Sequence, residues 1–312
     1  MKVTLKSVCC WIVALFCVAG TLWAQEPAAP PPDQTAANSS EAVGPPAPEL
    51  QTFPVLAAMD LLDPQETKGN KTAILKTVQH SADQGNPISQ YVMGSLYRLG
   101  MDHPAHVLDK DLDKAETYLS NAAIQGQIGA LAGMALIKLE RHQSDDAQVW
   151  AWAYAQFVAI QHKRFGGDKR VGQYGVKLFL KCKEQVGEAR ADSSEMQAYK
   201  RAFIDQYGSR ILSALGNSAR MYWGAPPKLL SSELSSPSGI SARYPALAEF
   251  LVEIRPDGSV ARAVVIDSLS NERIGSRWLS QVRSRVTFNA LAEDAPQLPR
   301  ISFFYAELEW EE

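Results

Sequence analysis

The chain has 312 residues, of which 46% are hydrophobic, and its formal net charge is −3 at pH 7. A chain of this length and hydrophobic content can bury one sizeable core and has room for a second. Its weakly acidic balance argues against nucleic acid or an anionic membrane surface as the main partner.

The N-terminal segment has the order of a secretory signal. Lys2 and Lys6 precede an apolar run over 8–22, which is followed by a small residue, Ala24. We therefore expect residues 1–24 to be a signal peptide, cleaved after Ala24, and the protein to be exported. The alternative is an uncleaved membrane anchor, because the run is close to the ~17–25 residues that span a bilayer.

The cysteines exclude an internal disulfide framework in the exported protein. Three of the four lie within the predicted signal: Cys9, Cys10 and Cys17. Only Cys182 remains, between Lys181 and Lys183 on a predicted helix. The neighbouring cations are expected to lower the pKa of its thiol, which leaves a reactive thiol as the alternative to an ordinary helix cysteine.

Residues 25–54 are rich in proline, alanine and serine. This composition cannot bury enough apolar surface to offset its ordering entropy, so we expect a disordered linker. From Val55 the pattern becomes helical and leads into a repeated motif.

The motif occurs twice between residues 82 and 139. The first copy contains Gly85, Gly94 and Tyr97, and a second amphipathic run follows it. The next copy begins at Gly126, 41 residues after Gly85. A period of this length with two helices per unit is typical of an α-helical repeat solenoid, in which each helix pair buries its apolar face against the next.

This pattern resembles the Sel-one-like repeat, a relative of the tetratricopeptide repeat. The residues that carry the resemblance are Gly85, Ser89, Gly94, Tyr97, Lys114, Ala115, Tyr118, Ala122, Ala123 and Gly126. The second copy keeps Ala130 and Ala135 but lacks the tyrosine. The resemblance implies an α-helical repeat domain over 55–215 that binds or scaffolds other proteins. It also implies structural roles for Gly85, Gly94, Tyr97, Ala115, Ala122 and Gly126.

Three features of this region have side chains that occur in binding sites. His103 and His106 could share a metal only on a regular helix, and Pro104 prevents that alignment, so no metal site is expected. The aspartates of 109–113 lack the later ligands of a calcium loop and fit the charged start of a helix. The aromatic segment 150–157 is expected in the core between helices, with a ligand groove as the alternative.

Two or three further helices are expected over 171–215, where they would cap the repeats, because an uncovered terminal repeat exposes its apolar face. A second linker, rich in serine and proline, is expected over 216–243. Its only apolar pair is Leu229-Leu230.

The C-terminal region, 244–312, has the period of strands. Alternating apolar residues over 247–254 and 260–266 flank a Pro-Asp-Gly-Ser turn, which predicts a β-hairpin. Apolar residues at four-residue steps predict a helix over 274–286, and 301–310 is predicted to be a strand. The sequence thus predicts a multidomain chain, with an α-helical repeat solenoid followed by a small α+β domain of order strand-strand-helix-strand and an antiparallel sheet.

This order, with Tyr244-Pro245 before it and Phe288 after the helix, resembles the C-terminal domain of TonB-family proteins. The resemblance implies a periplasmic domain that binds an extended peptide strand from an outer-membrane protein by adding it to the sheet. The interval after Tyr244-Pro245 is shorter here, and the N-terminal segment lacks the serine and histidine of TonB anchors, which puts energy transduction in doubt.

The candidate partner-binding residues follow from this resemblance and from charge. Strand capture would use the final strand around Phe303, Tyr305 and Glu307. The alternative is an edge blunted by glutamates. Arg273 and Arg277 give the predicted helix a basic face, which is either simply solvated or suited to acidic partners.

No pattern of a catalytic site occurs in the sequence, so no catalytic residues, cofactor or metal are expected. The first hypothesis is a periplasmic scaffold or adaptor of the cell envelope that binds protein partners. The alternative is a TonB-type energy-transducing transport component anchored in the inner membrane. A cell-wall hydrolase is a third possibility, which a zymogram would test.

Overall fold

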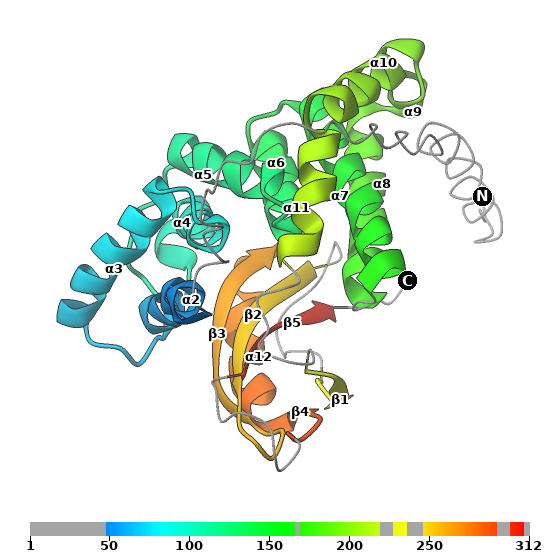
Figure 1. The fold of residues 1–312 in the computed structure, drawn as a ribbon. Helices are drawn as coiled ribbons and strands as arrows, with labels where there is room; N and C mark the ends of the chain where they lie inside the picture. Colours follow the sequence, from blue (N-terminus) through cyan, green and yellow to red (C-terminus); the bar gives the residue numbers. More distant parts are fainter. Residues whose placement is uncertain (1–47, 166–168, 219–226, 236–245, 292–299, 309–312) are drawn as a thin grey trace, which may run out of the picture. The chain divides into compact units, whose positions relative to one another are not determined.

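The computed structural model describes residues 48–165, 169–218, 227–235, 246–291 and 300–308 (Figure 1). These residues are mostly helical, with a small antiparallel sheet region. The predicted signal peptide, Tyr244-Pro245 and most of the first predicted linker lie outside them. Within the described ranges, no helix is both long enough and apolar enough to cross a bilayer.

The helices that precede the sheet follow one another along the chain. They are α2 (Pro48–Leu62), α3 (Lys68–Asp83), α4 (Pro87–Leu99), the 3₁₀ turn η1 (Gly100–Asp102), α5 (Leu112–Ile124), α6 (Ile128–Glu140), α7 (Ser144–Phe165), α8 (Lys169–Val186), α9 (Glu188–Ala191), α10 (Ser194–Phe203), the π-helical turn η2 (Ile204–Gly208) and α11 (Ser209–Ser218). Helix α2 begins inside the segment expected to be a linker through residue 54. A proline is well tolerated at the first helical position, because its missing N–H would have no intrahelical partner there.

Local sequence explains where α4 and α6 begin. Gly85 and Gly126 each adopt positive φ, +90° and +86°, in the turns before α4 and α6. A residue with a side chain is strained in that conformation, whereas glycine adopts it freely. The Asn86 side chain then accepts hydrogen bonds from the N–H groups of Ile88 and Ser89 at the start of α4. The two copies of the motif therefore make the same turn.

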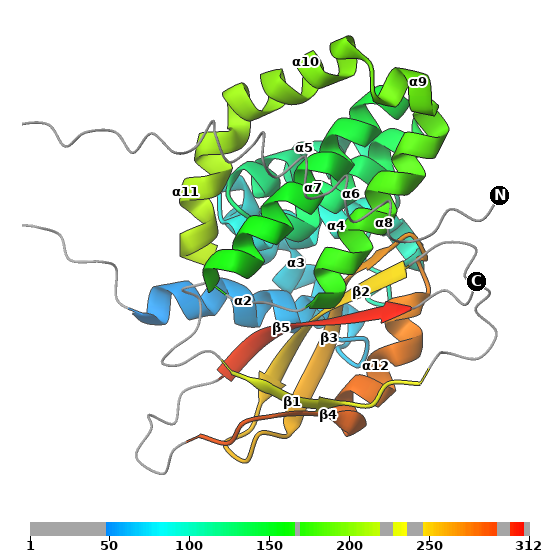
Figure 2. The same ribbon diagram turned by 90° about the vertical axis from the view of Figure 1, so that its right-hand side faces the viewer.

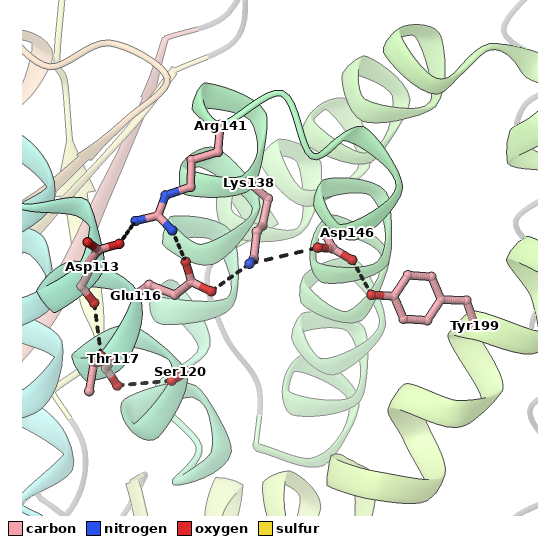
Figure 3. A network of polar contacts seen from close by, with 8 residues as sticks. All are labelled: Asp113, Glu116, Thr117, Ser120, Lys138, Arg141, Asp146 and Tyr199. Atoms are coloured by element: carbon pink, nitrogen blue, oxygen red, sulfur yellow. Dashed lines mark hydrogen bonds and ion pairs between the residues drawn. The ribbon is translucent and has the colours of Figure 1, made fainter.

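Small residues allow neighbouring helices to approach closely. A Cβ atom at Gly94 of α4 would lie 2.6 Å from Leu119 Cγ of α5, so only glycine fits there. Ala115 and Ala122 are fully buried, and the Tyr97 and Tyr118 rings stack with their centroids 6.0 Å apart. Ion pairs join α5, α6 and α7 on the surface, where Arg141 and Lys138 meet Glu116 (Figure 3).

The strands are β1 (Leu229–Ser232), β2 (Ala246–Ile254), β3 (Val260–Leu269), β4 (Val286–Phe288) and β5 (Arg300–Leu308), and helix α12 (Ile274–Arg285) lies between β3 and β4. Strands β3, β2 and β5 form an antiparallel sheet in that order, and β1 pairs with β4. The predicted hairpin is confirmed: the Gly258 N–H donates to the Arg255 carbonyl at 2.9 Å, and Gly258 has φ +90°.

Strand β1 lies within the second predicted linker. Leu229 packs against the core beneath α12, and pairing with β4 satisfies the backbone of this short segment. The apolar pair Leu229-Leu230 therefore marked a strand, whose partner is distant in sequence and could not be read from local pattern.

Both faces of the three-stranded sheet are covered (Figure 2). One face packs against α12, with Phe250, Val252 and Trp278 in that core. The other packs against the earlier helices, and its Leu251 and Ile266 belong to the same core as the helices. The described residues belong to one unit, Pro46–Glu312. The division into two domains stays a prediction, but the helices and the sheet share a core.

Candidate functional site

The sheet contacts every second helix of the series from α2 to α8. Helices α2, α4 and α6 contact β3, and α8 contacts β2 and β5. Polar contacts occur along this whole interface: Asp60 pairs with Arg262 at 2.5 Å, Tyr174 bonds Ser270 at 2.8 Å, and Lys177 pairs with Glu307 at 2.8 Å. The interface is therefore held by both apolar and polar groups.

Its centre contains a buried ion pair between α4 and β3. The Arg98 guanidinium donates to Asp267 and to the Ser268 carbonyl, the latter at 3.1 Å, and Ser95 Oγ donates to Asp267 Oδ2 at 2.8 Å. Asp267 is fully buried and Arg98 is 7% exposed. Burial alone would lower the pKa of Arg98, but the charge and hydrogen bond of Asp267 raise it above its ordinary value.

A second buried carboxyl, Glu249, lies beside this pair. It is 2% exposed, and its Oε2 accepts a hydrogen bond of 2.5 Å from the Tyr91 hydroxyl of α4. Burial, and to a smaller extent the charge of Asp267, raises the pKa of Glu249 to about 8, against the opposing effects of Tyr91 and Arg98. Burial likewise raises the pKa of Tyr91 well above its ordinary value. Among the described residues, Glu249 Oε1 has no hydrogen-bond partner.

A β-bulge explains how Asp267 reaches this position. Glu249 is paired with Asp267 and Phe250 with Val265, so Ile266 is the extra residue of β3. Such an insertion changes the alternation of side chains along a strand. As a result, the consecutive residues Ile266 and Asp267 both face the helices.

His103 belongs to the same interface. Its Nδ1 accepts the Ala105 N–H at 3.0 Å, so its Nε2 is the donor to the Ile266 carbonyl at 3.2 Å. Burial lowers the pKa of His103 to about 4, so the ring is neutral near pH 7. His106 instead bonds the Met101 carbonyl at 2.6 Å. Within the described ranges, no three His, Cys, Asp or Glu residues are grouped as metal ligands.

Glu249, Asp267, Arg98 and Tyr91 thus form one buried polar cluster, in which the Tyr91 hydroxyl donates a hydrogen bond to Glu249. The sequence did not predict this cluster. Because its members are buried between the helices and the sheet, the cluster joins the two layers.

Gly129 of α6 makes room for the Glu249 side chain. A Cβ atom there would lie 2.2 Å from Tyr91 Oη and 2.5 Å from Glu249 Oε2. Gly129→Ala is expected to displace this contact and to lower the free energy of unfolding by about 1–3 kcal/mol, as overpacking does. Urea unfolding measures the change.

Gly69→Ala is the matched control for this prediction. Gly69 also lies in a helix, α3, but nothing lies within 4 Å of its Cβ position. Alanine is expected to stabilise the protein there by up to about 1 kcal/mol, because it is the better helix former. Equal effects of the two substitutions would contradict the packing assigned to Gly129.

The sequence-predicted residues of the last strand lie on an outer strand of the sheet. Phe303 and Tyr305 are half-buried and face the helical layer. The Glu307 side chain is 1% exposed and pairs with Lys177, so this residue does not blunt the edge. The expectation of an edge blunted by Glu307 is therefore wrong; the glutamates after it lie outside the described residues.

Arg273 and Arg277 lie apart from these residues, near the start of α12. Both are exposed, while Ile274 and Trp278 between and beside them point into the core under the sheet. The structure thus does not bring the two predicted groups together in one site.

The expectation that the neighbouring cations lower the pKa of Cys182 is wrong, whereas an ordinary helix cysteine fits the structure. Cys182 is fully buried, and burial raises the pKa of its thiol to about 12 in spite of Lys181. The helix turns the thiol into the core, where desolvation outweighs the neighbouring cation. In the aromatic segment, Tyr154 and Phe157 are buried in the core, whereas Trp150 and Trp152 are partly buried against it.

Comparison of the chain with protein families, with curated proteins and with solved structures finds no match. Inferences about function therefore rest on the residues and contacts described above.

Proposed function

We propose that this protein is a periplasmic scaffold or adaptor of the cell envelope, which binds protein partners through its helical repeats and its sheet. The observation that carries the proposal is the position of β5 at one end of the sheet order β3-β2-β5. An outer strand can accept an extended peptide through main-chain hydrogen bonds.

The helical part is proposed to be a solenoid of the Sel-one-like type. Consecutive helices from α2 to α8 contact one another in chain order, and α2 also contacts α4, α4 contacts α6, and α6 contacts α8. Stacked helix pairs make such contacts. The equivalent turns at Gly85 and Gly126 support the same interpretation.

The shared core limits which helical surface can bind a partner. The sheet covers α2, α4, α6 and α8, so a partner of the helices would meet the other helices. Tyr199 of α10 is 43% exposed and offers an aromatic contact there. Two partners held by the helices and by β5 would then be kept at a fixed separation, as an adaptor requires.

Site-specific crosslinking in cells tests the proposal. A photoreactive residue at Phe303 is expected to form adducts with an extended segment of a cell-envelope protein, and one at Tyr199 with a second protein. Arg255, exposed in the β2–β3 turn, is the control position. Adducts equally abundant at Arg255, or absent at both test positions, would contradict the proposal.

The alternative is a TonB-type energy-transducing component. Sequencing the N-terminus of the exported protein separates the two, because a mature start at Gln25 removes the anchor that force transmission needs.

A further inference from the structure

The helix–sheet interface holds one carboxyl group more than it can neutralise. Glu249 and Asp267 are direct partners across β2 and β3, where opposite residues have Cβ atoms roughly 4.5–5.5 Å apart. Arg98 is committed to Asp267 by its ion pair. Two like charges at this separation, away from water, cannot both ionise without a large cost. Glu249 therefore keeps its proton while the interface is closed.

Several titratable and charged groups surround Glu249. The titratable and charged groups that face it or its partner are Tyr91 and Arg98 of α4, His103 after η1, Tyr154 of α7, Tyr174 of α8, Asp267 of β3, and Tyr305 and Glu307 of β5. Helix α6 contributes Gly129.

Near neutral pH most of these neighbours hold a fixed state. The phenols of Tyr91, Tyr154 and Tyr174 have pKa values raised by burial, and burial keeps His103 neutral. The pKa of Glu249, by contrast, is raised by burial from 4.5 to about 8. The stability that its proton provides is complete below pH 4.5 and is lost as pH rises through about 8.

We propose that Glu249 is a proton-operated latch of the helix–sheet interface: with its proton it stays seated between Tyr91 and Gly129, and loss of the proton separates β2 from α4 and α6. The chemical step is a simple acid dissociation: the Glu249 carboxyl group releases its proton to water and becomes a carboxylate. The carboxylate then leaves a site that already holds the charge of Asp267.

The latch goes beyond the proposed adaptor function, because it determines which surface of the helices is exposed for binding a partner. Opening would uncover the face of α4 and α6 that the sheet occupies. This face contains the buried Tyr91 ring of α4 and Gly129 of α6. A repeat protein uses surfaces of this kind for binding. The sheet would therefore cover this binding surface at neutral pH and expose it at alkaline pH.

Amide hydrogen exchange on the whole exported protein tests the latch. Protection of peptides from α4 and β2 is measured at about pH 6 and about pH 9, corrected for the intrinsic exchange rate with the unfolded chain. In the wild-type protein it is expected to fall by about a hundredfold over this range, because the closed form keeps a proton that the open form, with the ordinary pKa of 4.5, has lost, so that each pH unit up to about 8 is a tenfold change in equilibrium. In Glu249→Gln, which cannot ionise, protection should not change with pH.

Glu253→Gln is the matched control. Glu253 lies on the same strand, four residues further along, but is only half-buried and pairs with Arg262 at 3.2 Å. This variant should follow the wild-type pH dependence. The same pH dependence in wild type and Glu249→Gln would overturn the proposal.

Tyr91→Phe provides a second readout, which a purely structural role would not give. The Tyr91 hydroxyl favours the charged form of Glu249, so its loss should move the opening transition to higher pH. A transition that stays in place or moves to lower pH would overturn the proposal.

Discussion

Replacement of Arg98 by methionine is expected to lower the free energy of unfolding by about 3–5 kcal/mol. Methionine keeps much of the volume but leaves the Asp267 carboxylate buried without an opposite charge. Ser95 and the Ser268 N–H still donate to it, but neither neutralises it. Urea unfolding followed by circular dichroism measures the loss.

Arg141→Met is the control for this result. Arg141, at the end of α6, also makes ion pairs, to Asp113 and Glu116 (Figure 3), but its side chain is 28% exposed and that of Asp113 is 90% exposed. Its loss should cost about 1 kcal/mol or less, because exposed ion pairs contribute little. Adding Asp267→Asn to Arg98→Met should recover part of the stability, since it removes the unpaired charge. Equal losses for Arg98→Met and Arg141→Met would contradict the buried pair.

Trp278→Ala is expected to cost about 3–5 kcal/mol as well, the usual range for removing a large aromatic side chain from a core. Trp278 of α12 is 2% exposed under the sheet, and its Nε1 donates to the Ser235 carbonyl at 3.0 Å. Because the sheet also packs on the helical layer, the helical signal at 222 nm should lose stability together with the sheet.

Arg277→Ala, on the exposed side of the same helix, should change stability by no more than about 0.5 kcal/mol. A helical signal with the wild-type midpoint in Trp278→Ala would contradict the shared core, because the helices would then unfold independently of the sheet.

The elements that depend on local pattern were predictable. The hairpin at Gly258 follows from short-range chemistry, and the structure has it where the sequence places it. Strand β1 was not predictable in this way, because its four residues form strand hydrogen bonds only with β4, which lies far along the chain.

The buried site escaped prediction for two physical reasons. Alternation along β2 assigns Phe250 and Val252 to a core and Glu249 to the opposite face, which in a sheet with one helix would meet water. Here helices cover that face. The bulge at Ile266 then turns the Asp267 side chain to the face of the sheet opposite to the one that simple alternation predicts. No sequence pattern marks a bulge of this kind.

A signal for the covered face was nevertheless present. Strand β2 is a near-continuous apolar run, with Leu247 and Leu251 on one side and Phe250 and Val252 on the other. Runs of this kind are typical of strands buried on both faces.

The order of strands in the sheet also constrains how the chain folds during synthesis. Strand β2 lies between β3 and β5, and β5 is synthesised after the hairpin and α12. Until β5 arrives, β2 presents an unfilled edge, and pairing across so long a stretch of chain is slow. During this interval a chaperone or a neighbouring nascent chain would find an open strand, so truncation before Arg300 should yield aggregation rather than a smaller soluble protein.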